Sequence, residues 1–391
     1  MRKFLRLHPS IILLGLASLF NDLSSEIIYP LLPIFLTTYV GASFAFVGLI
    51  EGIAETTASL LKLYSGYLSD RIGNKKGLTV MGYAISNLVR PLIGIAYSPI
   101  FVLILRFFDR VGKGIRTSPR DAIVAAVADK GSMGRAFGFH RSMDNLGSLL
   151  GAFTGFVLLS FARLDIRVVF LLVIIPGILS VLAVLFGVRS VDAEITQGTK
   201  RISLSLKPFG KNFKMYLLVL GIFTLGNSSD AFLLLKAREC GLKDAYVPLL
   251  WMMLSLVRTV FSTPAGIISD KISRKKIIIT GWIIYALVYI AFAFSTKVWH
   301  IWVLFGIYGF YYALTEGVEK ALVADLAQEE FRGTAYGLYN FIVGILALPS
   351  SFICGLLWQR FGSIVALGFG ATLAFAASIL LVGVRYEKTE C

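Results

Sequence analysis

The sequence predicts an all-α integral membrane protein of 12 transmembrane helices, built as two related halves. Three observations lead to this fold class: the composition, a series of long apolar runs, and an internal repeat. The chain has 391 residues, of which 57% are apolar and only 16% are charged, and its mean hydropathy is +0.78. A soluble domain carries about 25% charged residues. We therefore expect the lipid bilayer, rather than water, to be the main solvent of this chain.

Twelve apolar runs have the length that a membrane-spanning helix requires. Backbone polar groups cannot stay unpaired in hydrocarbon, so about 20 apolar residues in a helix are needed to cross a core about 30 Å thick. Only short connections remain between the runs, which leaves no room for a soluble catalytic domain. The expected spans are Ile11–Leu36, Phe46–Leu68, Leu78–Tyr97, Ile100–Ala126, Ala136–Phe161, Val168–Val188, Met215–Leu235, Val247–Ile268, Ile277–Phe294, Trp299–Leu322, Thr334–Leu357 and Ile364–Val384.

The basic residues indicate the orientation in the membrane. A net charge of +15 would suggest nucleic acid as a partner of a soluble protein. Here the loops after the first and third spans carry no basic residue, and the positive-inside rule places the basic connections in the cytoplasm. We expect a multi-pass protein of the cytoplasmic (inner) membrane with both termini cytoplasmic and no nucleic-acid partner. The basic clusters are Arg2, Lys3 and Arg6; Arg71, Lys75 and Lys76; Lys200, Arg201, Lys207, Lys211 and Lys214; Lys271, Arg274, Lys275 and Lys276.

The sequence lacks the motifs of the common enzyme and metal sites. It contains no HExxH, no nucleophile elbow, no phosphate-binding Gly-Lys-Ser/Thr sequence and no Cys/His metal spacing. Its three cysteines are too scattered for a disulfide framework. The first apolar run is too long for a signal-peptide core and has no cleavage site after it, so it is kept as a span. We expect no enzyme activity, no cofactor and no metal site.

An internal repeat relates the two halves of the chain. The segment that begins at Gly66 recurs at Gly266, an offset of 200 residues. The segment that begins at Gly134 recurs at Gly333, an offset of 199, and Ser24-Ser25-Glu26 has a counterpart in Ser228-Ser229-Asp230, an offset of 204. Three echoes in register indicate duplication of a six-span unit. The expected domains are an N-terminal bundle (1–188), a cytoplasmic linker (189–214) and a C-terminal bundle (215–391).

The repeated loop resembles a known family signature. A positive-inside loop explains the lysines of both copies, but it does not explain their repeated Gly and Asp. The first copy resembles the loop between helices two and three of the major facilitator superfamily, and the second, with Ser273 in place of a glycine, resembles its degenerate partner. The resemblance covers essentially the whole chain. The resemblance implies that these loops form a gating latch, which stabilises one conformational state. The residues of this latch are Gly66, Asp70, Arg71, Gly73, Lys75 and Lys76, with Gly266, Asp270 and Lys271.

The resemblance implies two six-helix bundles around a central cavity that opens alternately to the two sides of the membrane. A solute site near the bilayer midplane is the expected geometry. Within that superfamily the chain resembles drug:proton antiporter-like bacterial members, and we expect the protein to function as a monomer.

Carboxylates in the first two spans are the expected proton-coupling groups. An ionisable group near the bilayer centre costs at least about 2.5–3.5 kcal/mol, so it requires a partner or a wet cavity. Asp22 and Glu26 share a helical face, and Glu55 lies deep in the second span. Such acids can exchange protons near neutral pH. The alternative is that each acid is permanently paired with an arginine.

The fourth span carries an unusual stripe of cations. Arg106, Arg110 and Lys113 follow i, i+4, i+7 spacing and so face one direction, which we expect to be the cavity. Arg110-x-x-Lys113-Gly114 resembles the family's fourth-helix motif, whose Arg is implicated in proton coupling. The alternative is that Arg110 only neutralises Asp22 or Glu26.

The fifth span combines polar residues with regularly spaced glycines. Gly138, Gly147 and Gly151 resemble the antiporter motif of drug:proton exporters, and with Gly155 they allow close helix packing. Ala152 replaces the expected proline, which weakens the inference of antiport. The further residues expected to line the cavity are Asn21, Arg90, His140, Arg141, Asp144, Asn227, Asp230, Lys236 and Arg258, whereas Glu316, Glu319 and Lys320 are interpreted as interfacial side chains that snorkel.

These residues favour a secondary active transporter that exports a small solute in exchange for protons. An alternative transport function uses the cationic residues of the N-terminal half to bind an organic anion or a metallophore, because Arg suits bidentate anion recognition. A non-transporting membrane sensor is the third alternative; it would bind solute without flux.

Overall fold

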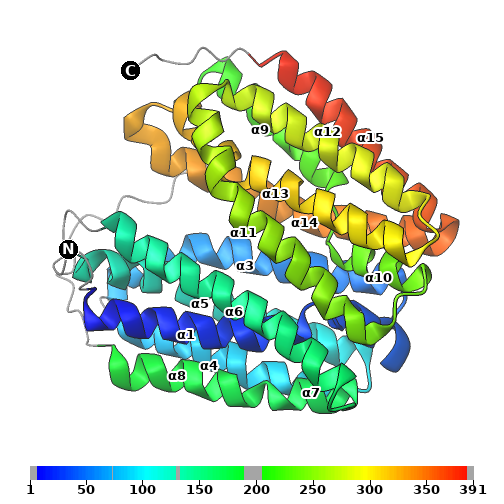
Figure 1. The fold of residues 1–391 in the computed structure, drawn as a ribbon. Coiled ribbons are helices and arrows are strands. Elements are labelled where there is room, and N and C mark those ends of the chain that lie inside the picture. Colours follow the sequence, from blue (N-terminus) through cyan, green and yellow to red (C-terminus); the bar gives the residue numbers. More distant parts are fainter. Residues whose placement is uncertain (1–6, 73, 129–132, 189–204, 385–391) are drawn as a thin grey trace. The chain divides into compact units, whose positions relative to one another are not determined.

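The computed structural model describes residues 7–72, 74–128, 133–188 and 205–384, without the side chains of residues 63, 66–72, 270 and 329. Within these residues the secondary structure is helical throughout (Figure 1). The long helices are α1 (Pro9–Ile28), α3 (Phe44–Ile72), α4 (Lys75–Leu92), α5 (Pro99–Val127), α6 (Met133–Ser160), α8 (Ile174–Gly187), α9 (Lys211–Gly226), α11 (Val247–Lys271), α12 (Arg274–Ala293), α13 (Val298–Leu326), α14 (Arg332–Phe361) and α15 (Ser363–Val382).

Shorter helices complete three of the spans. The first span continues beyond α1 through α2 (Leu32–Ile34) and the π-helical turn Phe35–Tyr39. Pro30 and Pro33 lie at this interruption, where proline removes helical hydrogen bonds. The sixth span joins α7 (Ile166–Leu172) to α8, and the seventh joins α9 to α10 (Ala231–Glu239).

Eleven helical segments of the described residues are long and apolar enough to cross a bilayer. The remaining predicted span corresponds to α5, which has 29 residues but carries five charged residues between Arg106 and Arg116. The fold class is that of a 12-helix membrane protein, and α5 is the helix whose charges must be compensated inside the protein.

The helices form two compact units. Residues 1–40 and 57–201 make up the first unit, and residues 41–56 and 202–391 make up the second. The first part of α3, up to Thr56, thus belongs to the second unit, although the repeat assigns the whole helix to the N-terminal half.

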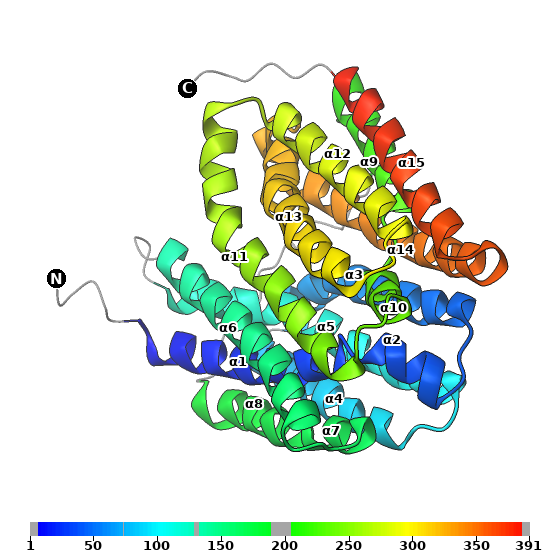
Figure 2. The ribbon, with the colours of Figure 1, turned by 45° about the vertical axis from the view of Figure 1, so that its right-hand side comes forward.

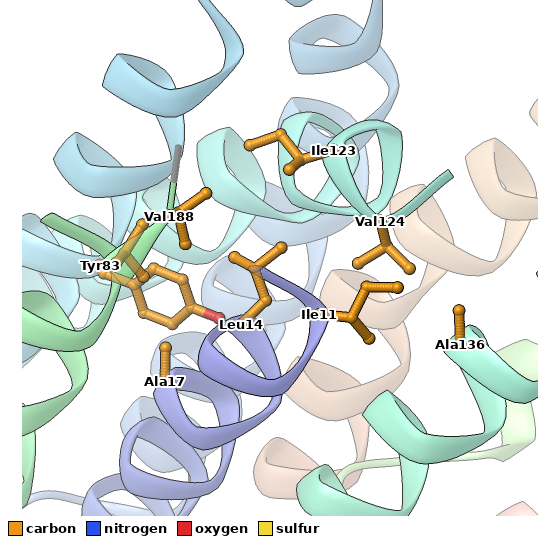
Figure 3. Packing of buried hydrophobic residues seen from close by; sticks show 9 residues of the cluster. Ile11, Leu14, Ala17, Tyr83, Ile123, Val124, Ala136 and Val188 are labelled. Carbon is orange, nitrogen blue, oxygen red and sulfur yellow. The ribbon is translucent and has the colours of Figure 1, made fainter. Parts of the chain in front are cut away.

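The first unit is built on α1 and α4. Helix α1 packs against α6 and α8, and α4 packs against α5 and α8 (Figure 1). One apolar cluster gathers around α1, where Ile11, Leu14 and Ala17 contribute to a core with residues of the other helices (Figure 3). The other members are Tyr83, Ile123, Val124, Ala136, Val184 and Val188. Burial of this cluster fixes the helices that carry the polar residues described below.

Two of the four predicted packing glycines lie where α6 crosses α1. A Cβ atom at Gly151 would lie 2.7 Å from the carbonyl oxygen of Leu23, and one at Gly147 would overlap the carbonyl oxygen of Leu19. Gly155 is buried in α6. Gly138 has no described atom within 4 Å of its Cβ position, so this member of the motif has no packing role in the first unit.

We expect Gly147→Leu and Gly151→Leu to lower the melting temperature of the detergent-purified protein, because each added side chain must separate α6 from α1. Overpacking of this kind typically costs about 1–3 kcal/mol. Gly138→Leu is the matched control on the same helix and should melt close to the parent. Equal losses in all three variants would contradict the assigned crossing.

The second unit packs around α12 and α13. Helix α12 lies against α13 and α15, α11 lies against α13, and α9 lies against α14 and α15 (Figure 2). The seventh span breaks between α9 and α10, at Asn227–Asp230. Interrupted spans in transporters expose backbone groups and commonly form binding sites.

Candidate functional site

A buried group of charges joins α4 to α5 in the first unit. Asp109 accepts from Arg90, with Nε–Oδ1 at 2.8 Å, and it also pairs with Arg106 (Nη1–Oδ2, 3.3 Å) and Arg110 (Nε–Oδ2, 3.5 Å). The Asp109 side chain is only 2% exposed. We call these four residues the Asp109 cluster. The cluster brings one carboxylate to three guanidinium groups, so it offsets part of the positive charge that distinguishes α5 from the other spans.

Glycines allow the backbones that carry this cluster to approach. A Cβ atom at Gly112 would lie 2.5 Å from Ser86 Oγ, and one at Gly82 would lie 2.6 Å from the carbonyl oxygen of Gly112. Ser86 Oγ donates to the Asp109 carbonyl oxygen at 2.9 Å and accepts from Arg116 Nη1 at 2.7 Å. Helices α4 and α5 therefore form one rigid pair.

Hydrogen bonds connect the Asp109 cluster to the first span. Arg90 Nη1 donates to the carbonyl oxygen and to Oδ1 of Asn21, at 3.0 and 3.1 Å, and to Asn87 Oδ1 at 3.2 Å. Asn21 Nδ2 in turn donates to Asp22 Oδ1 at 2.9 Å. The chain of contacts thus runs from Asp22 through Asn21 and Arg90 to Asp109.

Asp22 differs from Asp109 in its partners. Within the described residues no Lys, Arg or His nitrogen lies within 4 Å of the Asp22 carboxylate. Among the residues that the structure describes, its side chain accepts a hydrogen bond from the neutral amide of Asn21 alone. An unpaired carboxylate inside a membrane protein is costly, so a bound proton or a cationic ligand would stabilise this site.

A second polar group forms around Ser18, which lies on the same face of α1 as Asp22, four residues earlier. Asp144 of α6 accepts from Ser18 Oγ and lies 3.5 Å from His140 Nδ1. Arg120 Nη1 donates to Ser18 Oγ at 3.4 Å and pairs with Asp121 at 2.8 Å. Asp144 and Glu26, which carry like charges, and Arg116, which carries the opposite charge, all interact electrostatically with Asp22.

The other predicted residues of the N-terminal half differ in their surroundings, and Glu26 also interacts electrostatically with Asp22. Ser25 Oγ donates to Glu26 Oε1 at 3.4 Å. Lys113 and Arg141 have exposed side chains, so Lys113 does not share the buried environment of Arg106 and Arg110. Glu55 is exposed and lies in the part of α3 that belongs to the second unit.

Most of the predicted gating latch lies outside the described residues. Gly73 is not described at all, and only the backbone is described at Gly66, Asp70, Arg71 and Asp270. Lys75 and Lys76 are half-buried at the start of α4, where the Asn74 side chain caps the helix by accepting from Gly77 N at 2.8 Å. In the second copy, Gly266 is half-buried and Lys271 is exposed.

In the second unit, the broken seventh span brings an acid among tyrosines. Tyr308 and Tyr312 of α13 donate their hydroxyls to Oδ1 and Oδ2 of Asp230, each at 2.7 Å. Asn227 Nδ2 donates to the Tyr311 hydroxyl at 3.2 Å. Since both Asp230 oxygens accept from neutral donors, α10 is anchored to α13 at the break.

Two predicted cavity cations of the second unit have close acidic partners. Arg258 donates from Nε and Nη2 to the two carboxylate oxygens of Glu316, both at 2.7 Å. Lys236 Nζ donates to Ser363 Oγ at 3.0 Å and to Glu239 Oε2 at 3.3 Å. Both cations are thus compensated within the second unit.

The interpretation of Glu319 as an interfacial side chain is wrong. Glu319 is 7% exposed and its two oxygens accept from Trp282 Nε1 and from the Tyr339 hydroxyl, both at 2.9 Å. Glu316 and Glu319 are three residues apart and are therefore neighbours on the helix surface, and the sequence gives no direct signal that aromatic donors of α12 and α14 converge at Glu319.

The sequence prediction also omitted Asp109 from the site, although Asp109 is the acid on which three of the named arginines depend. A signal was present, because Asp109 lies between Arg106 and Arg110 in an apolar run.

Within the described part of the chain, no group of three His, Cys, Asp or Glu residues is placed to hold a metal ion.

Comparison with known proteins shows one family over essentially the whole chain. The family model of the Major Facilitator Superfamily matches residues 14–348 and 216–390. A protein of Methanocaldococcus jannaschii, described as an uncharacterized MFS-type transporter, is 34% identical over 382 residues, which cover 96% of this chain and 95% of that protein. The multidrug resistance protein MdtH of Salmonella paratyphi B is 23% identical over 321 residues, covering 80% of this chain and 77% of its own length.

Solved structures show the same fold at low sequence identity. The nucleoside transporter NupG matches with a TM-score of 0.84 at 10% identity, covering 96% of this chain and 100% of that chain. A bacterial homolog of the human lysosomal transporter Spinster matches with a TM-score of 0.73 at 18% identity, covering 97% and 98%. At these identities the matches establish the arrangement of helices.

Proposed function

Because the chain belongs to the Major Facilitator Superfamily and is a membrane transporter of small solutes, we propose that it exports its solute in exchange for protons. The observation that carries this proposal is the position of Asp22. It is an acid in the first span without a cation within 4 Å among the described residues, and it is hydrogen-bonded to the network that ends at Asp109. Gaining or losing a proton at Asp22 changes the charge that Asn21 and Arg90 experience.

In the proposed mechanism, Asp22 holds the exchanged proton, and Asp144 of the neighbouring helix interacts with its charge. The Asp109 cluster keeps Arg90 and Arg110 in place beside the first span. Coupling then consists of a difference in solute affinity between the protonated and deprotonated states. Glu26, Glu55 and the gating latch remain candidates for further steps of the cycle.

Export is the favoured direction because of the multidrug resistance relative and the glycines where α6 crosses α1. The functional unit is proposed to be a monomer in the cytoplasmic membrane with both termini in the cytoplasm. Binding of an organic anion or metallophore by Arg90 is less favoured, because Arg90 already donates to Asp109, Asn21 and Asn87.

The proposal is tested with the protein in liposomes that have an acidic lumen. Ethidium, a permanent organic cation, and carboxyfluorescein, an organic anion, serve as probes at a clamped membrane potential. Antiport predicts that a transported probe accumulates in the acidic lumen and leaves when nigericin removes the pH gradient. Accumulation only with an alkaline lumen would indicate symport and contradict the proposal; probe binding without flux would indicate a sensor. Protein-free liposomes provide the control for leakage.

A further inference from the structure

Glu319 is a buried acid of the second unit that forms no ion pair within 4 Å among the described residues. Its side chain is 7% exposed, and none of the ion pairs among the described residues includes it. The neighbouring acid on the same helix, Glu316, is held by Arg258 through two hydrogen bonds of 2.7 Å. Glu316 is therefore part of an ion pair, whereas Glu319 has none within 4 Å among the described residues.

Neutral donors surround the Glu319 carboxylate. Trp282 Nε1 donates to Oε1 and the Tyr339 hydroxyl donates to Oε2, both at 2.9 Å. The stack of Trp282 on Phe223, with ring centroids 4.3 Å apart, fixes the indole. These donors favour the charged carboxylate, whereas its burial favours the protonated acid. The opposition of the two effects is the physical requirement for an acid that exchanges a proton.

Among the described residues of the second unit, the titratable groups near Glu319 come from several helices. Lys320 is exposed on the same helix, and Arg274 of α12 pairs with Asp325. The Tyr216 hydroxyl of α9 is buried without a hydrogen-bond partner among the described residues, and it interacts electrostatically with Glu319. The groups that act on Glu319 are Glu316, Lys320 and Tyr311 on α13, Tyr216 on α9 and Tyr339 on α14.

The repeat shows that this acid is a feature of the C-terminal half alone. With the offset of 199 residues, Glu319 corresponds to Arg120 and Tyr339 corresponds to His140. In the first unit, Arg120 is paired with Asp121. The C-terminal half thus carries an acid where the N-terminal half carries a base, and among the described residues that acid has no cation within ion-pair distance.

From this geometry we propose that Glu319 is a second proton-binding site, located between α12, α13 and α14. The site binds and releases one proton. In both its protonated and its deprotonated form, the Glu319 side chain stays hydrogen-bonded to neutral side chains. Proton binding at Glu319 does not depend on the proposed function, but the use of this proton in transport does. In transport, the charge of Glu319 sets part of the dependence of solute flux on pH.

Infrared difference spectroscopy of the purified protein in nanodiscs tests the site without any solute. We expect a carboxylic-acid band that responds to pH across the range in which the protein stays folded, and we expect this band to be absent from Glu319→Gln. Tyr339→Phe removes one donor to the carboxylate and should raise the midpoint of that titration by about one pH unit. A merely structural role would leave the midpoint unchanged.

Glu239→Gln is the matched control. Glu239 also accepts from a tryptophan, Trp358 Nε1 at 3.0 Å, but it is exposed and paired with Lys236. This variant should keep the titrating band. If Glu319→Gln keeps the same band as the parent, or if no band titrates in this range, the proposal is wrong. If the band titrates but the parent shows no proton-linked flux, the proton site stands and the proposed antiport fails.

The same variants also separate the two proposals in transport. Glu319→Gln, which mimics the protonated acid, should flatten the dependence of solute flux on pH while solute still crosses the membrane. An unchanged pH profile would refute the use of this proton in transport.

Discussion

Asp109→Asn is expected to prevent the purified protein from remaining a folded, monodisperse particle. The substitution keeps the shape of the side chain and removes a carboxylate that Arg90, Arg106 and Arg110 share. Removing one partner from a buried ionic group costs about 3–5 kcal/mol, a large fraction of the total stability of a domain. Thermal melting followed by size-exclusion chromatography in detergent measures this loss.

Asp121→Asn is the matched control on the same helix. Asp121 is also paired with an arginine, at 2.8 Å, but its side chain is 41% exposed. Exposed pairs contribute about 0–1 kcal/mol, so this variant should melt near the parent. Equal melting temperatures for the two variants would show that the Asp109 cluster does not hold α4 and α5 together.

Asp22→Asn is expected to abolish accumulation driven by a pH gradient while leaving solute exchange in place. The amide cannot exchange a proton, but it can still accept from Asn21 Nδ2 as the carboxylate does. Coupling free energies of 1–3 kcal/mol correspond to roughly 5- to 150-fold differences in affinity. We therefore expect accumulation in the acidic lumen to fall by about tenfold or more.

Counterflow provides the control for this prediction. In vesicles loaded with unlabelled probe and without a pH gradient, Asp22→Asn should exchange labelled probe at a rate close to that of the parent. Loss of both activities would indicate that Asp22 binds the solute or supports the fold. Retention of both would assign the exchanged proton to another acid.

The sequence was sufficient for the fold because the bilayer imposes a strong constraint. Twelve apolar runs and the repeat at Gly66 and Gly266 follow directly from the printed residues, and α5 could be included as a span in spite of its charges. The breaks in the first and seventh spans follow less directly. Pro30 and Pro33 mark the first, but the second at Asn227–Asp230 contains no proline and depends on tertiary contacts such as those of Asp230 with Tyr308 and Tyr312.

The site could be predicted only in part, because charge pairing depends on which helices meet. The sequence indicates that Asp22, Arg90 and Arg110 need partners inside the protein. It does not show that Asp109 meets three arginines, that Asn21 links Arg90 to Asp22, or that Glu319 meets Trp282 and Tyr339. Each of these contacts joins residues of different helices or depends on side-chain rotamers.

Proton movement during solute efflux is the most direct test of the proposed antiport. Proteoliposomes contain the pH indicator pyranine and a transported probe, and the membrane potential is clamped with potassium and valinomycin before dilution into probe-free buffer. Antiport predicts that outward movement of the probe drives protons inward and acidifies the lumen, in either orientation of the protein, and that Asp22→Asn removes this signal. A lumen that stays at constant pH or becomes alkaline while the probe leaves would contradict proton exchange.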